Sequence, residues 1–120
     1  MNKKHPLIIS ALLCILFLAV NSCSKSNDDP SPNSPGTTNI SILSMSYSPS
    51  PATVAKGTVV KWTNTDGTAH TVTADDGTSF DSGNINASGT FSYTANVTGT
   101  FNYHCTIHGL TMAGVLVVNP

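Results

Sequence analysis

Apolar and polar positions alternate in short runs along residues 39–120, and Gly, Pro, Asp and Asn separate these runs. Alternation with a period of two predicts β-strands, and none of the runs has the period of a helix. About seven or eight strands at this spacing predict one all-β domain, a Greek-key β-sandwich or barrel. The predicted strands are Ile40–Tyr47, Thr58–Asn64, His70–Ala74, Thr90–Ala95, Thr100–Cys105 and Ala113–Val118, with a short edge segment at Thr78–Asp81.

The same alternation predicts which side chains face the core. Phe101, Tyr103 and Cys105 share one face of their strand, so Asn102 and His104 point the other way. His104 is therefore predicted to take no part in a site built around its neighbour Cys105. The other side chains predicted to face inward are Val60 with Trp62, His70 with Val72 and Ala74, and Phe91 with Tyr93; Met45 is also predicted to lie in the core.

The N-terminal segment has the pattern of an export signal and is not predicted to belong to the fold. Two lysines precede Leu7–Val20, an apolar run that is short for a membrane span and typical of a signal peptide. Val-Asn-Ser-Cys at its end resembles the lipobox of bacterial lipoproteins, so residues 1–22 are predicted to be removed and Cys23 to carry lipid. The protein would then be anchored to the bacterial cell envelope, on its periplasmic or surface side. Ordinary secretory cleavage nearby, with Cys23 left as a free thiol, is the alternative.

Residues 23–38 are predicted to form a flexible tether between the lipid and the domain. The stretch combines Pro30, Pro32 and Pro35 with Ser, Asn, Asp and Gly, and it has too little apolar surface to offset its ordering entropy. Asp28 and Asp29 resemble the acidic signals that route some lipoproteins to the cell surface, although a solvated linker explains them equally well.

The charge of the chain excludes several classes of function. It contains no Arg and no Glu, and its formal net charge is -1, so it offers no basic surface for nucleic acid. Its scattered Asp residues do not suggest a pair of catalytic carboxylates, and the sequence shows no nucleophile beside a general base. We therefore expect the protein not to be an enzyme.

Cysteine usage narrows the chemistry of the domain. Cys14 would leave with the signal peptide and Cys23 would carry lipid, so only Cys105 remains in the folded part. A single Cys cannot form an internal disulfide in an oxidising compartment. Its thiol is then buried and inert, paired with another molecule, or bound to a metal.

A group of potential metal ligands lies near the C-terminus. His108 follows Cys105 at a spacing that lets one tight loop present sulfur and imidazole to the same ion, and Met112 follows shortly before the last predicted strand. His70 begins another strand and could approach from across the sandwich. Two imidazoles and a thiolate, with a weak axial thioether, are the ligands expected for blue copper. Individually, His70 could be a polar turn residue, Cys105 a small buried apolar residue and Met112 part of the core.

Several segments together resemble the cupredoxin family, in particular its plastocyanin, amicyanin and pseudoazurin branches. The segments are Lys56–Asn64, His70–Val72, Gly99–Cys105 and Met112–Val118. The resemblance implies an eight-stranded Greek-key sandwich that binds one copper ion. It implies His70, Cys105 and His108 as equatorial ligands and Met112 as the axial ligand. Thr71 stands where this family has an Asn that supports the copper loop by hydrogen bonds, and its hydroxyl could take that role.

The resemblance implies an electron-transfer function. In the family, the loop histidine exposes its edge in an apolar patch, so His108 is predicted to be the point where electrons enter and leave. The partners of the protein would be unidentified redox proteins. The protein itself is expected to be a monomer that contacts the membrane only through its lipid. Copper carriage or storage without a redox role is the main alternative, and a metal-free interaction domain is a third. Zinc could also occupy His and Cys ligands in an overexpressed sample.

Overall fold

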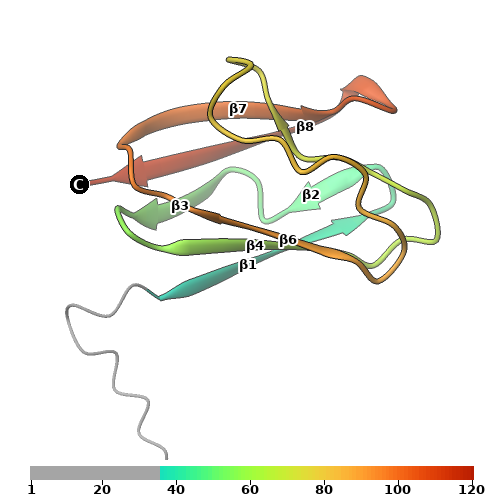
Figure 1. Cartoon of the computed structure of the whole chain (residues 1–120), viewed down its shortest axis with the longest axis horizontal. Coiled ribbons are helices and arrows are strands. Elements are labelled where there is room, and N and C mark those ends of the chain that lie inside the picture. Colours follow the sequence, from blue (N-terminus) through green and yellow to red (C-terminus); the bar gives the residue numbers. More distant parts are fainter. Residues whose placement is uncertain (1–35) are drawn as a thin grey trace, which may run out of the picture.

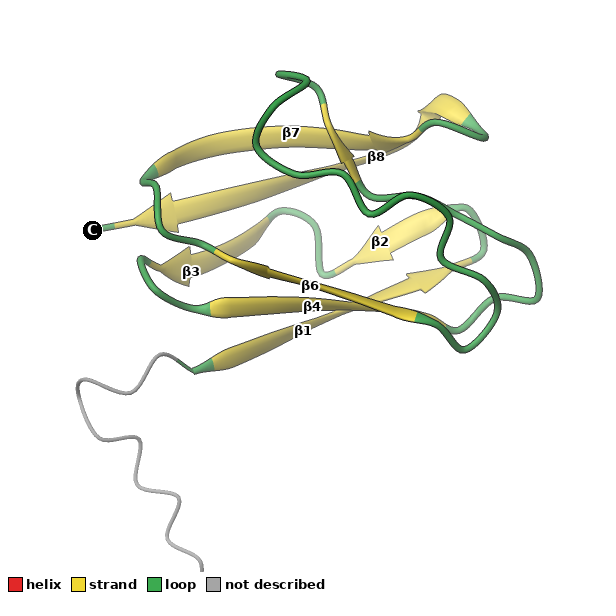
Figure 2. Cartoon of the chain, viewed as in Figure 1, coloured by secondary structure: helices red, strands yellow, loops and turns green. Residues whose placement is uncertain are grey.

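The computed structural model describes residues 36–120, which form eight β-strands in two sheets (Figures 1 and 2). The strands are β1 (Thr37–Leu43), β2 (Ser46–Ser48), β3 (Ala52–Ala55), β4 (Val59–Asn64), β5 (Thr73–Ala74), β6 (Thr90–Thr94), β7 (Gly99–Cys105) and β8 (Gly109–Asn119). Residues 36–120 contain no helix, and so none that could cross a membrane. The predicted all-β fold is confirmed.

The two sheets each contain four strands and face one another across the core. One sheet has the order β2-β1-β4-β6, and the other has the order β3-β8-β7-β5. β1 pairs parallel with β4 and β3 parallel with β8, while the remaining pairs are antiparallel. Both sheets therefore contain strands that lie far apart in the sequence, so the chain passes repeatedly from one sheet to the other (Figure 1).

The prediction of a single strand at Ile40–Tyr47 is wrong, because this segment contributes to two strands, β1 and β2. Ser44 and Met45 have φ angles of 50° and 65°, which reverse the chain between β1 and β2. The Ser46 hydroxyl donates a hydrogen bond to the Leu43 carbonyl and closes this turn. Met45 consequently lies at the tip of a turn with 41% of its surface exposed, so its prediction as a core residue is also wrong.

Three other predicted strand boundaries differ from the structure. The predicted strand His70–Ala74 contains only the two-residue β5, because His70 instead forms an isolated antiparallel bridge with Ile85. Thr78–Asp81 is not a strand; its last residue makes a single bridge to Thr73. β8 begins at Gly109, four residues before the predicted start at Ala113. In the first two cases the backbone forms only isolated bridges, and a single bridged residue has no alternating pattern that could define a strand boundary.

The strand β3, the four residues Ala52–Ala55, was not predicted from the sequence. The strand follows Pro51 directly, and its inward side chains, Ala52 and Val54, are both small. Such a segment is hard to separate from turn sequence by pattern alone. The predicted signal peptide, the lipid site at Cys23 and most of the predicted tether lie outside residues 36–120, the part described. Within that part, β1 already begins at Thr37, because Thr37 and Thr38 pair with β4.

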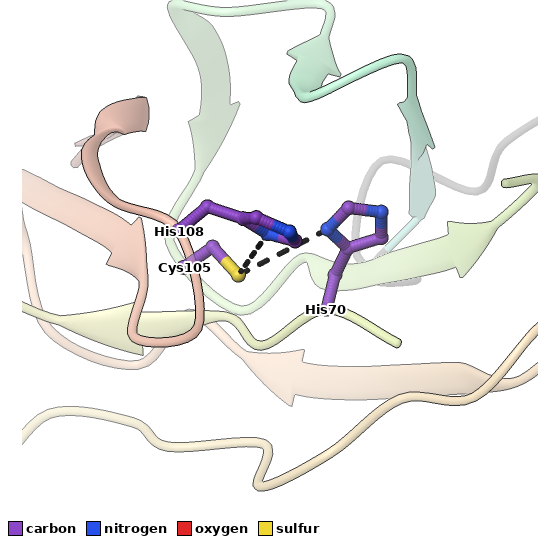
Figure 3. Close-up of side chains that lie close together, drawn as sticks. All are labelled: His70, Cys105 and His108. Atoms are coloured by element: carbon purple, nitrogen blue, oxygen red, sulfur yellow. Dashed lines mark hydrogen bonds between the residues drawn. The ribbon is translucent and has the colours of Figure 1, made fainter. Parts of the chain in front are cut away.

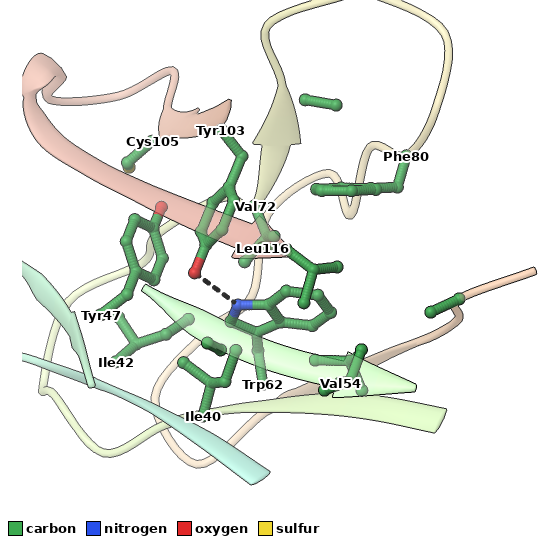
Figure 4. Close-up of a cluster of buried hydrophobic side chains, with 14 of the residues drawn as sticks. Ile40, Ile42, Tyr47, Val54, Trp62, Val72, Phe80, Tyr103, Cys105 and Leu116 are labelled. Atoms are coloured by element: carbon green, nitrogen blue, oxygen red, sulfur yellow. Dashed lines mark hydrogen bonds between the residues drawn. The ribbon is translucent and has the colours of Figure 1, made fainter. Parts of the chain in front are cut away.

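Trp62 is the centre of the core between the two sheets (Figure 4). Its ring lies edge-on to Tyr103 with centroids 5.7 Å apart, and its indole N–H donates a 3.3 Å hydrogen bond to the Tyr103 hydroxyl. Phe80 and Phe91 pack on the same indole at 5.8 and 5.7 Å. The alternation is confirmed for β4 and β7, since Val60, Trp62, Tyr103 and Cys105 are all fully buried. Burial raises the pKa of Tyr103 to about 12.

Tyr103 also depends on a glycine in the neighbouring strand. Gly114 pairs with Tyr103, and a Cβ on Gly114 would lie 2.4 Å from Cζ of the tyrosine ring. We predict that Gly114→Ala destabilises the domain by about 1–3 kcal/mol through overpacking, measured by urea unfolding without metal. Gly67→Ala is the matched control, because no atom lies within 4 Å of its added Cβ. Equal stability of the two variants would contradict this account of the packing.

Candidate metal centre

Three potential metal ligands from two separate segments converge at one end of the sandwich (Figure 3). Cys105 is the last residue of β7, His108 follows it in the turn to β8, and His70 lies in the connection between β4 and β5. The Cys105 sulfur lies 3.4 Å from Nδ1 of His108 and 3.9 Å from Nδ1 of His70. One ligand atom from each of the three residues lies within 4.8 Å of the other two.

These separations fit three bonds to one transition-metal ion. Metal–nitrogen and metal–sulfur bonds of about 2.0 and 2.3 Å at roughly 120° would hold nitrogen and sulfur about 3.8 Å apart. The two imidazole rings have their centroids only 4.9 Å apart, and Nδ1 of each ring lies beside the Cys105 sulfur, so both nitrogens can reach one ion. One soft sulfur and two imidazole nitrogens suit copper or zinc rather than the hard cations calcium and magnesium.

The three side chains differ in their access to solvent. His70 and Cys105 are fully buried, whereas His108 is partly exposed. Two apolar residues near His108 in the sequence reach the surface, Ile107 with 49% exposure and Leu110 with 76%. A metal held here would therefore be shielded from water on the His70 side and reach the surface through the imidazole of His108.

Thr71 holds the Cys105 loop against the segment that carries His70. Its backbone N–H donates a 3.3 Å hydrogen bond to the Cys105 sulfur, and its hydroxyl accepts a 2.8 Å hydrogen bond from the Thr106 amide. The Tyr47 hydroxyl donates to the Thr71 carbonyl from β2. Burial raises the pKa of Tyr47, which keeps this donor protonated. The hydroxyl of Thr71 thus contacts the Cys105 loop, and its role in supporting a copper centre stays a prediction.

Met112 lies within β8 rather than before it. The pairing of β7 with β8 shifts between His104 and Cys105, because Cys105 pairs with Gly109 and His104 already pairs with Ala113. Residues 110–112 form the extra length of β8 at this irregularity. Leu110 points to solvent there, whereas Met112 is buried with 1% exposure. The loop between His108 and Met112 is thus accommodated as a local bulge, and the axial role of Met112 stays a prediction.

Asp66, in the connection between β4 and β5, also lies at this site, although nothing in the sequence marked it as a part of the site. Its Oδ2 lies 3.0 Å from Nε2 of His70, the ring nitrogen opposite the one that faces the sulfur. The hydrogen bond with His70, followed by that from the Gly67 amide, lowers the pKa of the Asp66 carboxyl. The one signal in the sequence was that Asp66 stands four residues before His70, and this spacing of Asp and His is too common to indicate a contact.

His104 lies outside the cluster of His70, Cys105 and His108. Its Nδ1 lies 2.6 Å from Oδ1 of Asp75, and both side chains are partly exposed on the outer face of the sheet. The position of His104 therefore agrees with the alternation along β7, which placed its side chain opposite that of Cys105.

Comparisons with known proteins agree with this arrangement. A family model described as a cupredoxin-like domain matches residues 10–118. A purple cupredoxin from Nitrosopumilus maritimus has a similar structure, with a TM-score of 0.63 and 25% identity over 68% of this chain and 99% of that one. The Cu(I) form of an amicyanin mutant has a TM-score of 0.64 and 26% identity over 72% and 85% of the two chains. An oxidised amicyanin mutant has a TM-score of 0.64 and 27% identity over 70% and 83%. A search of curated proteins gave no match.

The hydroxyl of Thr71 can be tested without any metal. We predict that Thr71→Val, which keeps the shape but removes the acceptor for Thr106, lowers the free energy of unfolding by about 1 kcal/mol. Amide hydrogen exchange at Thr106 should accelerate in the same variant. Thr71→Ser keeps the acceptor and should leave the Thr106 amide protected. Unchanged exchange at Thr106 in Thr71→Val would show that this hydrogen bond does not hold the loop.

Proposed function

The chain belongs to the cupredoxin-like family, and from this premise we propose that it transfers single electrons between redox partner proteins. The observation that carries the proposal is the convergence of one buried thiol and two imidazoles within 4.8 Å of one another. Two imidazoles and a thiolate are the equatorial ligands of blue copper centres. A redox centre that reaches the surface through one imidazole is suited to outer-sphere transfer.

The cofactor is copper, and its proposed ligands are His70, Cys105 and His108, with Met112 as the axial ligand. Bound copper supplies a one-electron couple between Cu(I) and Cu(II). Cys105 would contribute a thiolate, whose negative charge the Thr71 amide would stabilise, and the two histidines would each contribute Nδ1. Because these ligands come from a sheet end and a hydrogen-bonded loop, they can keep one geometry in both oxidation states.

His108 is the proposed point of electron exchange with partner proteins. It is the one partly exposed member of the three-residue cluster, and Ile107 and Leu110 form apolar surface close to it in the chain. Leu43, the last residue of β1, and Met45, in the turn that follows, are further exposed apolar residues. The backbone of Ser44, which lies between them, hydrogen-bonds Asp66. Weak redox complexes use small interfaces, which an apolar surface of a few side chains suits.

The proposal includes the expectations that the protein acts as a monomer and is not an enzyme. The proposed ligands would surround the metal and leave no open position for a substrate. We also propose that Cys23 carries the lipid anchor and that the tether holds the domain near partners in the same membrane. Tethering raises the effective concentration of such partners. The periplasmic or surface location remains part of this proposal.

The visible spectrum tests the copper assignment. Addition of Cu(II) to a fragment of residues 36–120 should produce an intense thiolate-to-copper charge-transfer band, and Cys105→Ser should abolish it. His104→Gln is the matched control, because His104 is the neighbour of Cys105 but faces outward, and it should keep the band. A Cys105→Ser protein that stayed coloured would contradict the ligand assignment. A protein that bound copper without colour and released it rapidly would favour copper carriage instead.

The reduction potential tests the proposed axial ligand, Met112. Met112→Leu should leave copper bound but raise the reduction potential, because loss of a donor atom destabilises Cu(II) more than Cu(I). A tenfold change in the balance of the two states corresponds to about 59 mV for one electron. Met45→Leu is the control, since Met45 is a methionine on the surface. Equal potentials in both variants would exclude Met112 as a ligand.

A further inference from the structure

The two nitrogens of the buried His70 ring face different chemical groups. Nδ1 faces the sulfur of Cys105, whereas Nε2 lies 3.0 Å from the carboxylate of Asp66 and 3.3 Å from the hydroxyl of Thr68. A carboxylate can only accept a hydrogen bond, so its contact requires a proton on Nε2. A hydroxyl can donate or accept, so the contact with Thr68 imposes no tautomer.

The carboxylate of Asp66 is itself held in place by its loop. The Gly67 amide donates a 2.8 Å hydrogen bond to Oδ1 of Asp66, which leaves Oδ2 directed at His70. The Asp66 amide donates to the side-chain oxygen of Asn64 at 2.9 Å. Asn64 is fully buried, and its side-chain nitrogen donates to the carbonyls of Thr68 and Ile85. The loop 64–68 is therefore fixed at both ends by one buried amide.

The backbone of His70 is fixed by the same structure. His70 and Ile85 exchange two backbone hydrogen bonds of 3.1 and 2.8 Å, and Ile85 also accepts one of the Asn64 hydrogen bonds. The carboxylate and the imidazole are thus positioned from a common support, and their contact does not depend on flexible side chains alone. The Asp66 side chain keeps 28% of its surface exposed, while that of His70 has none.

We propose that Asp66 is a positioning residue for the metal centre, which fixes His70 as the tautomer with a proton on Nε2 and a free lone pair on Nδ1. The lone pair then faces the sulfur of Cys105, where a metal is to bind, before any metal arrives. A carboxylate behind a metal-bound imidazole also raises the basicity of the ligand. Its negative charge stabilises Cu(II) relative to Cu(I), and this second effect rests on the proposed function.

The tautomer can be measured in the metal-free full chain. Nitrogen-15 NMR of the histidine side chains at pH 8 should show His70 with the proton on Nε2 only. Asp66→Asn keeps only one acceptor oxygen, for which the Gly67 amide and His70 compete, and its amide nitrogen can donate to Nε2, so a fraction of His70 should carry its proton on Nδ1. Asp66→Ala lets the Thr68 hydroxyl donate to Nε2, so a fraction of His70 should carry its proton on Nδ1. The backbone amide spectrum of each variant shows whether its fold is retained.

The charge effect is measured by the reduction potential of the copper-loaded full chain. Asp66→Asn should weaken Cu(II) binding about tenfold relative to Cu(I), which corresponds to a potential about 59 mV higher. Asp75→Asn is the matched control, because it removes an equal charge from the other Asp–His pair, that with His104, which is not a ligand. Asp75→Asn should change the potential much less.

A split between the Asp66 variants and the Asp75 variant is specific to the proposed role. Asp66→Asn and Asp66→Ala should each change both the potential and the tautomer of His70, whereas Asp75→Asn should leave the tautomer of His70 unchanged and change the potential much less, which a merely structural role would not produce. An Nδ1 proton on His70 in the unmodified chain, or equal potentials in Asp66→Asn and Asp75→Asn, would overturn the proposal. Failure to bind copper would refute the proposed function, while the metal-free tautomer would still decide the role of Asp66.

Discussion

The attachment of the Cys105 loop to the segment 70–73 brings the proposed metal ligands of two distant segments together. Cys105 and His70 are 35 positions apart in the chain, and the sulfur meets the second segment through the amide of Thr71. The Thr71 hydroxyl in return accepts a hydrogen bond from the Thr106 amide and lies 3.2 Å from the Thr106 hydroxyl, so hydrogen bonds of Thr71 join the two segments at three points. Since His108 belongs to the same turn as Cys105, fixing this turn brings both imidazoles to the sulfur.

The same attachment explains how the site joins to the core. Tyr47 holds Thr71 from the other sheet and packs edge-on against Tyr103, which in turn contacts Trp62. The proposed metal ligands are therefore supported by aromatic packing on one side and by the loop 64–68 on the other. Electron transfer is rapid when the ligands move little between the two oxidation states. A support of this kind keeps such movements small. Here the stability of the sandwich and the proposed function rest on shared contacts.

Much of the fold could be predicted from the sequence, and so could the cluster of His70, Cys105 and His108. Alternation located β4, β6 and β7 because one face of each packs against the core, and the spacing of Cys105 and His108 pointed to a shared ion. The turn at Ser44 was missed because neither it nor Met45 is a usual residue at positive φ. Asp66 was missed because its role depends on a contact between loop backbone and a buried ring. Such contacts depend on how segments meet in space, which no local pattern records.

The central claim is that one sulfur and two imidazole nitrogens bind a single copper ion. X-ray absorption at the copper edge of the loaded protein measures these bonds directly, in both oxidation states. The account predicts one short copper–sulfur bond and two copper–nitrogen bonds, with little change between Cu(II) and Cu(I). A copper shell made only of nitrogen and oxygen atoms would contradict it, because Cys105 would then not be a ligand.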